Sequence, residues 1–73
     1  MDLKELRENQ DLRLVDVASN LDVAESTVRN WEKGRTQPTL RAEQFQRLIE
    51  LYQVTFENLV LAINLSASID PQE

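Results

Sequence analysis

The apolar residues of this chain recur with the period of a helix rather than with the alternation of a strand. Between positions 14 and 21 they are spaced i, i+3, i+4 and i+7, which gathers them on one helix face, and positions 45 to 52 repeat this spacing. The pattern predicts five helices, over Leu3–Asn9, Leu14–Leu21, Glu25–Lys33, Leu40–Tyr52 and from Phe56 to about Leu65. We therefore expect an all-α fold, a compact five-helix bundle.

Residues that cap or interrupt helices support these boundaries. Gly34 is suited to the left-handed conformation that ends a helix. Pro38 prevents a helix from continuing through the polar loop that follows Gly34. Thr39 and Thr55 stand where they would cap the last two helices. The small, polar, proline-containing stretch 66–73 is expected to be a flexible tail, which leaves 1–65 as the folded domain.

The composition excludes several kinds of chemistry. The chain has no cysteine and no histidine, so disulfides, thiolate zinc sites and most metal-binding and general-base chemistry are excluded. We expect no enzyme and no metal, cofactor or small-molecule ligand. The longest apolar run, Leu59–Ile63, is far shorter than the roughly 18 residues that span a membrane, and three of the first five residues are charged, unlike a signal peptide. A cytoplasmic protein with no membrane partner is expected.

The distribution of charge along the chain says more about a possible partner than the net charge does. A net charge of −5 argues against a nucleic-acid partner. Between positions 29 and 41, however, four basic residues face a single acid, so this segment carries +3 and the remainder −8. A basic stripe on an acidic body is still able to dock on phosphates.

Residues 14–31 fit two helices that cross steeply and are joined by a tight turn. Such a unit needs apolar residues on the facing surfaces, a small residue at the crossing and an apolar residue that anchors the turn. Six positions fit this pattern: Val17, Ala18, Leu21, Val23, Val28 and Trp31.

With these residues in place, the chain resembles the lambda-repressor-like, XRE-type helix-turn-helix DNA-binding domains over about residues 3 to 62. The matching segments are Leu3–Arg7, Val17–Ala18 with Leu21, Ser26–Gly34, Pro38–Thr39 and Tyr52–Leu59. The resemblance implies a small transcriptional regulator that binds DNA, commonly as a dimer. It also implies a partly buried ion pair between Arg7 and Glu32.

Three positions depart from the family pattern. Leu14 replaces a glutamine that contacts phosphate in the family, so we expect Leu14 to pack against the protein. Asp22 replaces the turn glycine and must adopt a conformation that few residues tolerate. Ala24 replaces the hydroxyl residue that opens the recognition helix, so this helix should lack a side-chain N-cap.

The recognition helix offers four candidate base contacts. If its valine and tryptophan face the core, then Glu25, Ser26, Arg29 and Asn30 project outward. Arginine binds guanine, asparagine binds adenine, and serine binds either. Glu25 is suited to accept from cytosine, although phosphates repel it.

Four further residues are candidate phosphate contacts: Thr27, Lys33, Arg35 and Arg41. Hydroxyls and mobile cations fix the register on a duplex without reading its sequence. For the base and phosphate candidates alike, the alternative is an ordinary solvated surface, because exposed polar residues are common.

The last helix has more apolar residues than a small core needs. Phe56 and Leu59 are expected to close the core, which leaves some of the others without a partner: Val60, Leu61, Ile63 and Leu65. This strip is either a self-association surface or part of a fully intramolecular helix. A homodimer would place two recognition helices roughly 34 Å apart on a near-palindromic site.

These observations lead to one expected function and one alternative. We expect a transcriptional regulator that binds double-stranded DNA sequence-specifically as a homodimer. The alternative is a protein-interaction module, such as an antitoxin or adaptor, that keeps the helix-turn-helix fold, and the acidic total charge supports it.

Overall fold

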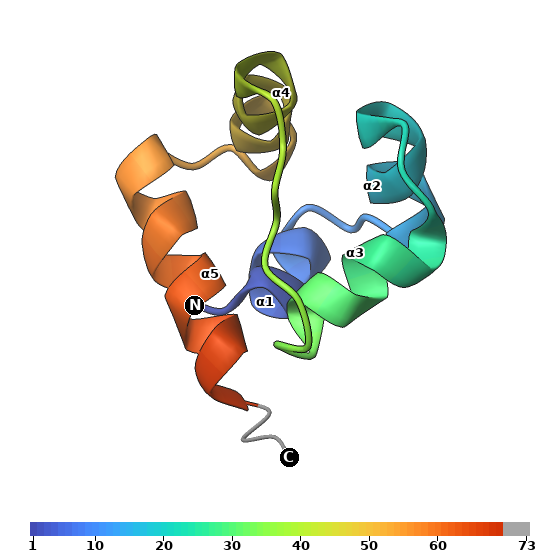
Figure 1. Cartoon of the computed structure of the whole chain (residues 1–73). Coiled ribbons are helices and arrows are strands. Elements are labelled where there is room, and N and C mark those ends of the chain that lie inside the picture. The colour runs from blue at the N-terminus through green and yellow to red at the C-terminus, as the bar shows by residue number, and fades with distance from the viewer. Residues whose placement is uncertain (70–73) are drawn as a thin grey trace.

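The computed structural model describes residues 1–69 and, within them, contains five α-helices and no strand. The helices are α1 (Leu3–Asn9), α2 (Leu14–Leu21), α3 (Glu25–Glu32), α4 (Ala42–Tyr52) and α5 (Phe56–Ile69) (Figure 1). The expected all-α, five-helix fold is confirmed. None of these helices is long and apolar enough to cross a membrane.

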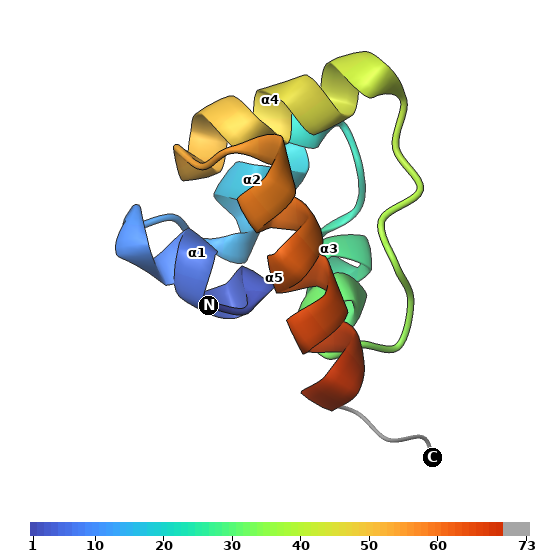
Figure 2. The same ribbon diagram turned by 90° about the vertical axis from the view of Figure 1, so that its left-hand side faces the viewer.

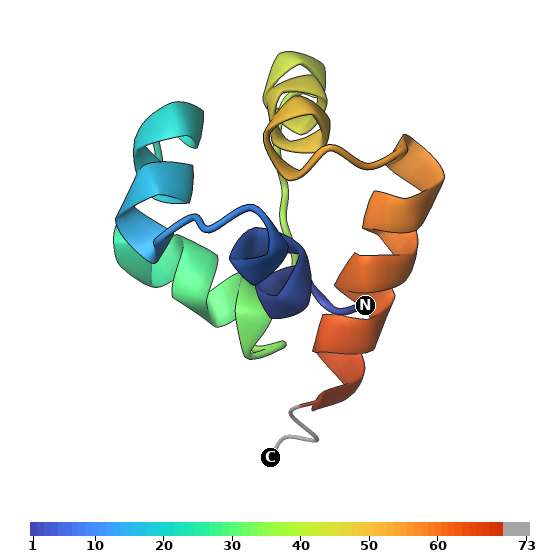
Figure 3. The ribbon, with the colours of Figure 1, turned by 180° about the vertical axis from the view of Figure 1, so that it is seen from behind.

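The helices enclose one core to which all five contribute. α1 packs against α3, α4 and α5, and α2 packs against α3 and α4. Figure 2 shows the connection between α3 and α4 running the height of the molecule, and Figure 3 shows α1 between α3 and α5. The buried apolar residues come from all five helices: Leu3, Leu6, Val17, Ala18, Leu21, Val28, Trp31, Leu48, Tyr52, Leu59 and Ala62.

Several helix ends follow the expected chemistry. Gly34 follows α3 with a φ of +75°, and a Cβ at this position would collide with the carbonyl oxygen of Ser66. The Thr55 hydroxyl accepts a hydrogen bond of 3.1 Å from the backbone N–H of Asn58 and so caps α5. These two predictions are confirmed.

The predicted start of α4 is wrong. Leu40 and Arg41 are not helical, and the helix begins at Ala42, so Thr39 lies too far upstream to cap it. The cap is formed instead by the side chain of Gln44, whose oxygen accepts from the backbone N–H of Arg41 at 2.9 Å. Leu40 packs against the core from the extended segment, which keeps this residue out of the first helical turn.

The predicted tail boundary at residue 66 is also wrong. α5 continues to Ile69, and Ser66 is fully buried, with its hydroxyl accepting a 2.9 Å hydrogen bond from the backbone N–H of Leu3. This partner satisfies the only buried polar residue among those that the structure describes. The rest of the predicted tail, residues 70–73, lies outside the described residues.

Phe56 does not close the core as predicted. Its side chain is 56% exposed and packs edge-to-face on Phe45 of α4, with ring centroids 6.3 Å apart. Phe56 is the first residue of α5 and lies at the edge of the bundle, whereas Leu59 and Ala62 reach its interior.

Candidate nucleic-acid interface

The α2–α3 unit has the geometry of a helix-turn-helix. Asp22 ends α2 in the left-handed conformation with a φ of 58°, as the missing turn glycine required. The backbone N–H of Val23 then donates to the carbonyl oxygen of Ala18 at 3.0 Å, and its side chain packs against the core. The turn is therefore held by both a backbone hydrogen bond and an apolar anchor.

The buried face of α3 is as the sequence predicted, and three of the four candidate base contacts are exposed as expected. Val28 and Trp31 are buried. Glu25, Ser26 and Arg29 are exposed, whereas Asn30 is half-buried. The helix thus presents polar, hydrogen-bonding side chains to solvent while its apolar face anchors it to the bundle.

The start of α3 lacks a side-chain cap, as expected from Ala24. Only backbone bonds close the first turn, from the N–H groups of Thr27 and Val28 to the carbonyl oxygen of Ala24. Leu14 packs against the core, as expected from the loss of the family glutamine.

Two of the candidate base contacts are paired with each other. Nη2 of Arg29 lies 3.2 Å from Oε2 of Glu25, which is one turn earlier on the same helix. Both side chains are about half exposed, at 45% for Arg29 and 48% for Glu25. Surface pairs of this spacing contribute only about 0.3–0.5 kcal/mol, so Arg29 is free to exchange this partner for another.

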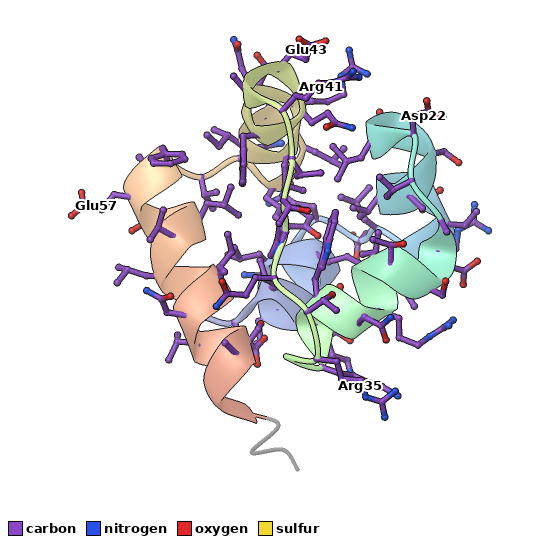
Figure 4. All side chains as sticks on the ribbon, in the orientation of Figure 1. Asp22, Arg35, Arg41, Glu43 and Glu57 are labelled. Atoms are coloured by element: carbon purple, nitrogen blue, oxygen red, sulfur yellow. The ribbon has the colours of Figure 1, made fainter. Side chains whose placement is uncertain are left out.

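The candidate phosphate contacts do not form one cluster. Figure 4 shows Arg35 beside the carboxyl end of α3 and Arg41 beside Glu43 at the start of α4, at opposite ends of the α3–α4 connection. Lys33 is exposed at the end of α3, and Thr27 is half-buried. Arg35 and Arg41 therefore cannot contact the same phosphate.

The ion pair that the resemblance implied between Arg7 and Glu32 is present. Nε of Arg7 lies 2.7 Å from Oε2 of Glu32 and Nη2 lies 3.2 Å from Oε1, while Nη1 donates to the Leu12 carbonyl oxygen at 2.8 Å. The side chains are only 12% and 7% exposed. The hydrogen bond to Glu32 raises the pKa of Arg7, although burial opposes this. The pair fixes α3 against α1.

Comparison with known proteins also identifies a helix-turn-helix domain. The family model described as a helix-turn-helix domain matches residues 2–62. The chain belongs to this helix-turn-helix domain family. The HTH-type transcriptional regulator DdrOP3 of Deinococcus deserti is 36% identical over 58 residues, which cover 80% of this chain and 43% of that protein. The chain thus spans less than half the length of this relative. No solved structure matches the chain.

Sequence reasoning missed one cation of this helix-turn-helix domain. Lys4 lies one turn before Arg7 on α1, and the Arg7–Glu32 pair brings this face of α1 against α3. Lys4 and Lys33 consequently line the same hollow in the surface. The predicted ion pair, combined with the three-residue spacing of Lys4 and Arg7, was the signal that would have found it.

Proposed function

We propose that the chain is a sequence-specific regulator of transcription of the XRE type, which binds double-stranded DNA by laying α3 in the major groove. The observation that carries this proposal is the division of α3 into a buried apolar face and an exposed face with Ser26 and Arg29. The helix-turn-helix family and the name of the Deinococcus relative support it.

In this proposal the exposed face of α3 reads bases. Arg29 binds a guanine edge, Asn30 an adenine edge, and Ser26 approaches the bases from the amino-terminal half of the helix. Glu25 contributes by accepting from cytosine. The remaining candidates, Thr27, Lys33, Arg35 and Arg41, contact phosphates on either side of the groove.

The proposed active form is a homodimer that forms through α5. Besides Phe56 at its first position, this helix exposes apolar surface at Val60, Leu61 and Leu65, which are 38%, 56% and 49% exposed. Ile63 packs against the core, so the exposed strip is narrower than the sequence indicated. Burying this strip between two copies would place two α3 helices on successive turns of one face of a duplex, where the dimer blocks or recruits polymerase.

Selection from a random duplex library at two salt concentrations tests DNA binding. We expect an enriched, near-palindromic site whose affinity falls steeply with salt, with a slope of about −0.9 per phosphate contact. Arg29→Ala should then lose about 1–3 kcal/mol of discrimination at one base pair. Equal weakening on selected and random duplexes would contradict a base-reading role for Arg29.

Sedimentation measurements test the dimer. Leu61→Glu should yield a monomer because it places a charge within the apolar strip, whereas Val15→Glu, the same kind of change at an exposed valine on α2, should leave the dimer intact. A wild-type monomer at every concentration, and also on the selected site, would contradict the proposal.

A protein-interaction module is the second candidate, favoured by the net charge of −5. It differs in its response to salt and sequence. If no duplex is enriched, and the affinity for random duplexes is weak at low salt, this candidate replaces DNA binding.

A further inference from the structure

A hollow of about 250 Å³ opens where α1, α2 and α3 meet. Its position follows from the packing of α1 and α2 against α3, which Figure 3 shows from behind. Six residues line it: Lys4, Arg7, Leu14, Arg29, Glu32 and Lys33. Four of them are cations and one is an acid.

The acid does not neutralise this hollow. Both carboxylate oxygens of Glu32 bind Arg7, so these two charges cancel each other. Lys4 and Lys33 are exposed, and neither takes part in an ion pair found within residues 1–69. Within the described part of the chain, the ion-pair partner of Arg29 is the exposed Glu25. An uncompensated positive charge is therefore concentrated here, on a chain whose net charge is −5.

The chemistry of the lining suits a single oxyanion. Ammonium and guanidinium groups are the usual partners of phosphate oxygens, and the lining includes only one apolar side chain, that of Leu14. Leu14 is also the first residue of α2, so the positive end of a helix dipole lies at the rim. An apolar ligand or a metal cation would find no matching groups.

The position of the hollow identifies the source of this oxyanion. Arg29 belongs both to the exposed face of α3 and to the lining of the hollow. A duplex that is read by α3 therefore carries its backbone past the hollow. We propose that the hollow binds one phosphodiester of that duplex, and that Lys4 of α1 and Lys33, the residue that follows α3, jointly bind this phosphate. This inference rests on the proposed function and adds Lys4 to the interface.

Charge-neutral variants test the shared phosphate on the selected duplex. Lys4→Gln and Lys33→Gln should each weaken the selected and random duplexes alike. Because the proposed regulator binds as a homodimer, the two changes together should lower the salt slope by about 1.8, the contribution of one phosphate in each half-site, so that their effect on affinity shrinks about 12-fold between 50 and 200 mM salt. A decrease of about 3.6 would mean two separate phosphates in each half-site and overturn the shared site.

Arg47→Gln is the matched control. Arg47 is an exposed cation on α4 that donates to the backbone carbonyl of Asn20, at the other end of α2 from the hollow. This variant removes the same charge and should leave the salt slope unchanged. If Lys4→Gln behaves like Arg47→Gln while Arg29→Ala still loses base preference, the hollow is refuted and the proposed function stands. If the wild-type chain binds no duplex, both proposals fail.

Single methylphosphonate substitutions in the duplex locate the phosphate. At one position in each half-site, neutralising the phosphate should weaken binding of the wild-type chain but not of the Lys4→Gln/Lys33→Gln double variant. Equal weakening of both proteins at every position would refute the site. Melting curves of the variants should coincide with the wild type, because both lysines are exposed.

Discussion

Helix α3 takes part in two arginine–glutamate ion pairs that differ almost entirely in their surroundings. Glu32 binds Arg7 of α1 through two hydrogen bonds, with both side chains nearly buried. Glu25 binds Arg29 of α3 itself through one hydrogen bond, with both side chains about half exposed. The same two chemical groups therefore serve as a fixed connection between helices in one place and as a replaceable contact in the other.

The difference in exposure sets the energy of each pair. Removing one partner of a buried pair leaves an uncompensated charge and costs about 3–5 kcal/mol. Separating an exposed pair with i, i+4 spacing costs only about 0.3–0.5 kcal/mol, since water replaces the lost partner. Arg29 is therefore able to leave Glu25 for a base or a phosphate, whereas Arg7 stays in place and keeps α3 oriented.

The largest expected effect is that of Arg7→Ala. This change strands the buried Glu32 carboxylate and leaves the Leu12 carbonyl oxygen without its donor. We expect a loss of about 3–5 kcal/mol, which is comparable with the whole stability of a domain this small. Urea unfolding followed by the fluorescence of Trp31, the only tryptophan, measures it.

The double variant Arg7→Met/Glu32→Leu is the control for this prediction. Replacing both members of a buried pair by apolar side chains removes the stranded charge and should recover most of the lost stability. A loss below about 1 kcal/mol for Arg7→Ala would place the buried pair in the same class as the exposed one.

The next effect concerns Tyr52, which is buried near the Arg7–Glu32 pair. Burial raises the pKa of its phenol, the Glu32 carboxylate raises this pKa further, and Arg7 lowers it. Because the folded-state pKa exceeds the unfolded value of about 10, stability is unaffected below pH 10. It then falls by about 1.4 kcal/mol per pH unit until pH reaches the folded-state pKa.

Urea unfolding between pH 9 and pH 11 measures this dependence. Tyr52→Phe removes the titrating group and should flatten the curve relative to the wild type. Since Tyr52 is the only tyrosine, phenolate absorbance should appear only as the protein unfolds. Phenolate formation near pH 10 in the folded protein would show that the buried environment does not control this group.

The smallest expected effect is that of Glu25→Gln. Removing the exposed partner of Arg29 should lower stability by no more than about 0.5 kcal/mol, and 1 M salt should abolish this difference through screening. Glu32→Gln, the same change at the buried glutamate, is the matched variant and should cost more. A similar loss for both variants in urea unfolding would remove the distinction between the two pairs.

The sequence predicted the parts of the fold that depend on local patterns. The i, i+3, i+4, i+7 spacing located α2, and Thr55 and Gly34 marked helix ends because capping is a property of a few adjacent residues. The predicted cap at Thr39 was wrong because a capping residue must be followed directly by the helix, and Leu40 instead packs against the core. The length of α5 was missed because Ser66 finds its partner at Leu3, at the other end of the chain.

The candidate site shows the same limit. The exposed face of α3 followed from the phase of Val28 and Trp31 along one helix. Lys4 was missed because its place beside Lys33 follows only when the i, i+3 spacing of Lys4 and Arg7 within α1 is combined with the Arg7–Glu32 pair between α1 and α3.

The hydrogen bond from the Leu3 amide to the Ser66 hydroxyl joins the first helix to the last. Because it is fully enclosed, neither terminus can fray past this point without exposing the other. Trimming the chain from the front or from the back should therefore produce the same loosened molecule. A graft of this domain into another protein would have to carry residues 3 to 66 together.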